Sequence, residues 1–229
     1  MMLLVVLVTL VFYLTPQEVA NWYHAAALEV YLVGDTEAAI SYINRALEWS
    51  PDKLDVYVTR SEIYQRLGHH KEAIRDQDRI VEIYRASTSL SLDNALNNRA
   101  YYRALGKIEL DEGLEDVQQA IKIVGVERAS FLDTRGYLYY LLGNLDFAEP
   151  DLVRATELAE QDYDFAIRKI NQISHVGLRE KQRTQYDHYL AIIYHHLGLL
   201  YQKQNRHEQA NHYLSRGDEL GYDPEQGVW

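Results

Sequence analysis

The chain has 229 residues, of which 47% are hydrophobic, enough for one elongated repeat domain or two small globular domains with a buried core. Its 34 acidic and 23 basic residues give a net charge of −11, which makes nucleic acid a poor partner because no basic surface is available to displace counterions from phosphates. The chain has no cysteine, so it contains neither a disulfide framework nor a thiolate zinc site.

Residues 1–14 form an uncharged, almost entirely apolar segment that ends at Thr15-Pro16. As a helix it would rise about 21 Å, less than the ~30 Å of a bilayer's hydrocarbon core. No basic residue precedes it, and no small-residue cleavage site is evident between Phe12 and Trp22. A membrane anchor or uncleaved signal is slightly favoured over an extra helix packed on the next domain or a start codon placed inside a longer apolar span. We therefore expect a membrane-associated location slightly more than a cytoplasmic one.

A pattern of small residues with a period of about 34 runs through most of the remaining chain. Gly34, Gly68 and Gly143 each lie five residues before an alanine. Small residues let two helices cross at about 8–10 Å, and glycine readily ends a helix in the left-handed conformation, so the pattern predicts repeated antiparallel helix pairs. The repeat-defining positions are Ala27, Gly34, Ala39, Ala46, Pro51, Gly68, Ala73, Gly136, Gly143, Ala148, Ala155, Gly198 and Ala210.

These residues resemble the tetratricopeptide repeat family, in its bacterial type, in which a small residue and an aromatic one precede a glycine turn and two alanines follow it. Repeats are expected at about 20–53, 54–87, 92–128, 129–162 and 191–224. The third repeat has Gly106 at the turn with two inserted residues, and the fifth has Asn205 there. The resemblance implies an all-α fold over residues 16–224, a right-handed superhelical solenoid of antiparallel helix pairs, followed by a short tail at residues 225–229.

The repeat rhythm is interrupted after the fourth copy by an insert at residues 163–190. Residues 152–174 and 178–204 both have helical patterns, and the His175-Val176-Gly177 stretch between them is typical of a turn. The sequence therefore predicts an elongated helical hairpin near the C-terminal end. Whether this hairpin projects from the solenoid or folds back across it stays open.

The residues do not form the motifs of known catalytic or metal sites. Nine histidines are present, but His207 and His212 are five residues apart, whereas a helical zinc motif needs a spacing of four. No phosphate-binding loop, nucleophile elbow or kinase signature occurs. We therefore expect no metal, no cofactor and no enzymatic activity.

In the family, the first helix of each repeat lines a concave groove that usually holds an extended peptide or a helix of a partner. Tyr31, Tyr137 and Tyr140 are the expected anchors because aromatic side chains supply large contact areas at low entropic cost. The alternative that they are core spacers stays open. By resemblance the groove residues are His24, Leu28, Tyr31, Glu62, Arg66, Asn97, Arg103, Asp133, Tyr137, Tyr140, His195 and His196, with Ala100 also placed in the groove of the third repeat.

One subclass of the family clamps the acidic tail of chaperones with lysine, asparagine and arginine side chains. Asn97 matches its middle asparagine, but Glu62 and Thr134 occupy positions where that clamp needs asparagine and a basic residue. The chain is therefore not expected to bind an acidic tail, and a neutral or mildly basic peptide suits it better. The predicted function is a protein-binding scaffold or adaptor. The alternative is a self-associating, homo-oligomeric assembly protein that uses the long hairpin, and an enzyme comes third.

Overall fold

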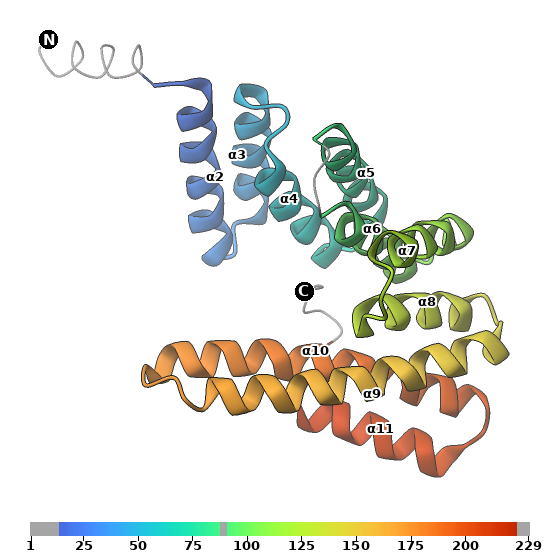
Figure 1. Cartoon of the computed structure of the whole chain (residues 1–229). Coiled ribbons are helices and arrows are strands. Elements are labelled where there is room, and N and C mark those ends of the chain that lie inside the picture. Colours follow the sequence, from blue (N-terminus) through green and yellow to red (C-terminus); the bar gives the residue numbers. More distant parts are fainter. Residues whose placement is uncertain (1–13, 88–90, 224–229) are drawn as a thin grey trace, which may run out of the picture. The chain divides into compact units, whose positions relative to one another are not determined.

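The computed structural model describes residues 14–87 and 91–223, and these residues form helices joined by short turns (Figure 1). The chain divides into two compact units, Met1–Ser87 and Thr88–Trp229. No strand occurs in the described ranges. The prediction of an all-α fold built from helix pairs is confirmed there, while the predictions for the apolar segment before residue 14 and the tail after residue 223 concern residues outside them.

The described part of the first unit forms two helix pairs. Helices α2 (Pro16–Leu32) and α3 (Thr36–Trp49) form one pair, and α4 (Leu54–Arg66) and α5 (His70–Ala86) form the other. Helix α2 begins at a capping box, in which the Thr15 side chain accepts from the Glu18 backbone and the Glu18 carboxylate accepts from the Thr15 backbone. Gly34, at the turn of the first pair, has a φ of +89°, which glycine adopts without the penalty that a Cβ imposes.

The second unit contains three further pairs. They are α6 (Leu92–Gly106) with α7 (Leu110–Val124), α8 (Ala129–Leu141) with α9 (Leu145–Ile170), and α10 (Val176–Lys203) with α11 (His207–Glu219). Helices α9 and α10 have 26 and 28 residues and also pack on each other, which confirms the elongated hairpin. Tyr163 on α9 donates a hydrogen bond of 2.6 Å to Asp187 on α10, and Tyr194 donates one of 2.7 Å to Glu160.

Glycine is required at two helix crossings in the second unit. A Cβ added to Gly136 would lie 2.7 Å from Cγ of the fully buried Leu152, and one added to Gly198 would lie 2.7 Å from Cγ of Leu214. Both distances are below any normal carbon contact, so a larger residue would force the two helices apart. The small residues at these positions therefore set the helix spacing.

The predicted turn of the third repeat is wrong by one residue. Gly106 is the last residue of α6, and the left-handed turn residues are Lys107, with a φ of 53°, and Glu109, with a φ of 51°. Relative to the family pattern, the turn therefore contains one inserted residue rather than two, and every position assigned to α6 moves by one residue towards the C-terminus. Ala100 consequently lies in the core, fully buried, and Tyr101 takes the position that was assigned to Ala100.

The second, third and fourth repeats each also carry a largely buried ion pair that the sequence pattern does not indicate. An arginine on the first helix donates two hydrogen bonds, from Nε and Nη2, to an aspartate on the second helix at 2.6–2.8 Å. The terminal repeats have Ala26 with Tyr42 and Leu197 with Tyr213 at these positions. The three pairs are Arg60–Asp76, Arg99–Asp116 and Arg135–Asp151.

Candidate partner-binding site

The groove positions predicted in the first unit lie on α2 and α4 and are accessible to different degrees. Leu28 and Arg66 are exposed, whereas Tyr31 packs against the core of the unit. Burial raises the pKa of Glu62, and the nearby Arg66 opposes this shift. His24 joins the two helices, since its Nε2 lies 2.8 Å from Oγ1 of Thr59.

In the second unit, the first helices α6 and α10 each contact α8, which brings aromatic side chains of three repeats together. The His196 ring stacks on Tyr137 with centroids 3.9 Å apart and an interplanar angle of 8°. Tyr140 lies parallel to Tyr137 at 5.9 Å, and Tyr101 lies 6.0 Å from His196. We call Tyr101, Tyr137, Tyr140, His195 and His196 the aromatic cluster.

A buried charged group lies under the aromatic cluster. Asp133 is completely buried, and its two carboxylate oxygens lie 2.9 and 3.0 Å from Nδ1 of His196, which is itself 3% exposed. An ionised carboxylate only accepts hydrogen bonds, so Nδ1 of His196 carries the proton and donates it. The pair fixes the plane of the imidazole on which Tyr137 stacks. Asp133 and His196 therefore support the cluster from below rather than offering exposed contacts to a ligand.

Two other predicted groove residues, both on α6, are also buried. Arg103 forms ion pairs with Asp116 and Glu109 of its own repeat, which is the consequence of the shifted register. Asn97 is 2% exposed, and its Oδ1 has no hydrogen-bond partner among the described residues. The side chains of the second unit that remain partly exposed at predicted groove positions are thus Tyr137, Tyr140 and His195.

His195 is partly covered by a residue from the end of the same unit. The Tyr222 ring stacks on the His195 ring with centroids 3.9 Å apart and an interplanar angle of 12°. Burial and, to a smaller extent, the neighbouring His196 lower the pKa of His195 to about 4, against the opposing effect of Asp218. At neutral pH the His195 ring is therefore uncharged, as suits an aromatic stack.

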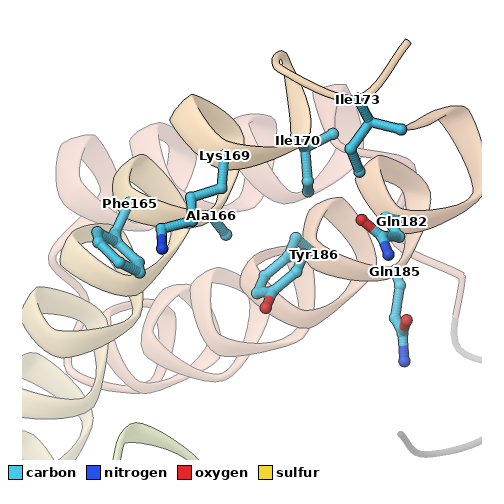
Figure 2. A pocket seen from close by; sticks show the side chains of 8 residues that line it. All are labelled: Phe165, Ala166, Lys169, Ile170, Ile173, Gln182, Gln185 and Tyr186. Carbon is cyan, nitrogen blue, oxygen red and sulfur yellow. The ribbon is translucent and has the colours of Figure 1, made fainter. Parts of the chain in front are cut away.

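The tip of the long hairpin contains a separate hollow of about 440 Å³ (Figure 2). Phe165 of α9 and Tyr186 of α10 lie on its walls and are 57% and 37% exposed. Lys169 lies over the Phe165 ring, with Nζ 4.9 Å from the ring centroid. The hollow is lined by Phe165, Ala166, Lys169, Ile170, Ile173, Gln182, Gln185 and Tyr186.

The described residues give no support for a metal centre or a membrane span. No three histidine, aspartate or glutamate side chains within them gather closely enough to hold a metal ion. Across residues 14–87 and 91–223, every helix is too short or too polar to cross a bilayer. The aromatic cluster consists of phenol and imidazole rings, which are suited to stacking on other aromatic side chains.

A stack of antiparallel helix pairs with small residues at the crossings is the architecture of helical-repeat scaffolds. A match to the tetratricopeptide repeat family covers residues 23–53, 54–87 and 191–220. These segments carry tetratricopeptide repeats, as the sequence pattern indicated, and folds of this kind generally act as interaction scaffolds.

Known proteins resemble this chain in sequence or in fold. A TPR repeat-containing protein of Methanocaldococcus jannaschii is 25% identical over 169 residues, 72% of this chain and 29% of that protein. The structure of BtubC from P. vanneervenii has a TM-score of 0.60 at 18% identity, covering 91% of this chain and 85% of that one. TTC0263 of Thermus thermophilus, a thermophilic TPR protein, has a TM-score of 0.56 at 19% identity, covering 88% and 91%. The chain spans less than a third of the length of the curated relatives that it matches.

Two residues of the site were missed at the level of sequence. Tyr101 was missed because Lys107, a residue that rarely adopts a left-handed conformation, forms the turn that Gly106 was expected to form. Tyr222 was missed because its ring partner lies on another helix. Gly221, two residues after the end of α11, was the one available signal, since glycine at this position typically reverses the chain.

Proposed function

We propose that the protein is an adaptor that binds a peptide or helical segment of a partner protein through the first helices of its repeats. The observation that carries this proposal is the aromatic cluster. Tyr137, Tyr140 and His195 form a partly exposed surface that is held in place from beneath by the buried Asp133–His196 pair. Burying an aspartate and a histidine contributes little to stability compared with well-packed apolar residues. Such a pair is more readily explained by a need to orient the rings above it.

Electrostatics favours a neutral or mildly basic partner segment. The chain has a net charge of −11, and the groove positions include Glu62 in the first unit and Asp133 in the second. An acidic peptide would be repelled by these groups. The partner surface that fits is therefore apolar or aromatic, with few carboxylates.

Site-specific cross-linking tests the adaptor function. A photoreactive phenylalanine analogue is introduced at Tyr140 in the aromatic cluster or, as a matched control, at Phe147, which is 64% exposed on α9. We expect a partner to cross-link from position 140 and not from position 147. The affinity of that partner, once purified, should fall at least about tenfold in the Tyr140→Ala variant, as expected for an interface anchor. Equal cross-linking at both positions, or unchanged affinity of the folded variant, would discard the site.

Self-association through the hairpin is the second candidate function, and the apolar tip favours it. Phe165 and Tyr186 are exposed on the walls of the hollow shown in Figure 2, and Val176 and Leu178 are exposed in the first turn of α10. Exposed apolar groups gathered in one place often mark an interface. Sedimentation of the wild-type chain and of the Phe165→Glu variant across a range of concentrations measures this. A wild-type chain that stays monomeric throughout would refute it.

A further inference from the structure

The last described residues of the chain turn back towards the aromatic cluster in a defined way. Helix α11 ends in a Schellman motif: the Tyr222 N–H donates to the Gly217 carbonyl, and the Gly221 N–H donates to the Asp218 carbonyl, both at 3.0 Å. Gly221 has the left-handed backbone that this motif needs, with a φ of +80°. The motif fixes the direction in which Tyr222 leaves the helix.

The Tyr222 side chain occupies a specific place rather than a loose surface position. It is half-buried, and its ring is nearly parallel to that of His195. Burial raises the pKa of its hydroxyl to about 12, and the carboxylates of Asp223 and Asp133 act in the same direction. The neighbourhood of Asp133 and Tyr137 places Tyr222 at the edge of the aromatic cluster.

We propose that Tyr222 occupies the slot over His195 that a partner's aromatic side chain takes, so that partner binding displaces the chain's own tail, which here means Tyr222 and Asp223. This inference rests on the adaptor function proposed above and specifies its ligand: an extended segment carrying an exposed aromatic residue. The slot accepts a flat ring on the uncharged imidazole face of His195.

Tyr222 is a weak occupant of the slot because of nearby charges. Asp223 follows it directly and Asp133 lies buried near its ring, so the carboxylate of Asp223 is brought towards that of Asp133 when the ring is seated. A partner segment with lysine or arginine beside its aromatic residue offers the same stacking without this repulsion. The slot therefore selects an aromatic residue with basic or neutral flanks over the acidic tail.

The test uses the full chain and two blocked synthetic peptides, KGYKG and KGAKG. Binding is followed by NMR through the ring signals of His195 in the wild-type chain and in Tyr222→Ala, Tyr222→Phe and Gly221→Ala variants. If the tail is seated in about nine of ten molecules, the wild-type chain binds KGYKG about tenfold more weakly than Tyr222→Ala does. Tyr222→Phe keeps the ring and should behave like the wild type. Gly221→Ala strains the turn while leaving the slot intact, and it should bind KGYKG more tightly than the wild type.

Two results would overturn the proposal. One is equal affinity of the wild-type chain and the Tyr222→Ala variant for KGYKG. The other is a Tyr222→Ala variant, folded by circular dichroism, that binds KGYKG no better than KGAKG. If Tyr222→Ala fails to fold, the comparison of Gly221→Ala with the wild type decides in the same way. Neither result would refute the adaptor function, because the cross-linking at Tyr140 tests that function independently of Tyr222.

Discussion

Replacing Gly136 by alanine places a single methyl group at the crossing of α8 and α9. Its Cβ would lie 2.7 Å from Cγ and 3.0 Å from Cδ2 of Leu152, and 3.1 Å from Cβ of Asp151. Leu152 is completely buried, so its side chain cannot move into solvent. The helices must separate by several tenths of an ångström or Leu152 must adopt a strained rotamer.

The two energy terms of this substitution oppose each other. Overpacking of a core by one or two carbon atoms costs about 1–3 kcal/mol, whereas alanine gains about 1 kcal/mol over glycine in a helix interior. We therefore expect Gly136→Ala to lower the free energy of unfolding by about 1 kcal/mol. Gly136→Val adds two more methyl groups than Gly136→Ala, and valine has a lower helix propensity than alanine, so it should cost about 2–4 kcal/mol.

Gly177 provides a matched control for the same substitution. A Cβ there would lie 3.6 Å from Cε1 of His175, an ordinary van der Waals distance, so Gly177→Ala should be neutral or slightly stabilising. Urea unfolding followed by circular dichroism measures each change, and hydrogen exchange of α8 and α9 peptides localises it to the second unit. If Gly136→Val unfolds at the same urea concentration as the wild type, glycine does not set the helix crossing and the packing argument is wrong.

The remaining predictions concern charged and partly buried groups. Arg135→Ala leaves Asp151 buried without its partner and should lower the free energy of unfolding in urea by about 2–4 kcal/mol. The double variant Arg135→Leu, Asp151→Tyr reproduces the Leu197 and Tyr213 pair of the fifth repeat, and it should cost less than either single change. The pKa of His195 is about 4 in the folded chain against an ordinary 6.5, so the unfolded chain binds more protons between these values and stability falls as the pH is lowered from 6.5 towards 4. Allowing for the partial exposure of the ring, the free energy of unfolding should fall by about 1–2 kcal/mol between pH 7 and pH 5 because of His195. Urea titrations at the two pH values measure this, and in the His195→Gln variant the difference between them should be smaller by that amount. Tyr194→Phe removes the hydrogen bond to Glu160 and should lower stability by about 1 kcal/mol, with unchanged stability contradicting a role for this bond in holding α9 and α10 together.

Much of the fold could be predicted because it is encoded locally. The spacing of Gly34, Gly68 and Gly143 marks the turns, since only a few residue types adopt a left-handed backbone without strain. The third turn could not be placed, because Lys107 and Glu109 adopt that conformation only where the packing of α6 on α7 compensates for their strain. The candidate site was predicted less well than the fold. The sequence identified Tyr137, Tyr140 and His195, but it also assigned to the groove Asn97, Arg103, Asp133 and His196, which the structure buries.

The sequence by itself determined the helix pairs, their approximate bounds and the long hairpin, since apolar periodicity and small residues are properties of neighbouring positions along one chain. Only the tertiary structure decided which polar residues are covered. Asp133 and His196 are 63 residues apart and meet because α8 and α10 pack together, and Tyr222 reaches His195 because the chain reverses at Gly221. The physical reason is that burial depends on what every other helix contributes at a position, and no repeat pattern records that.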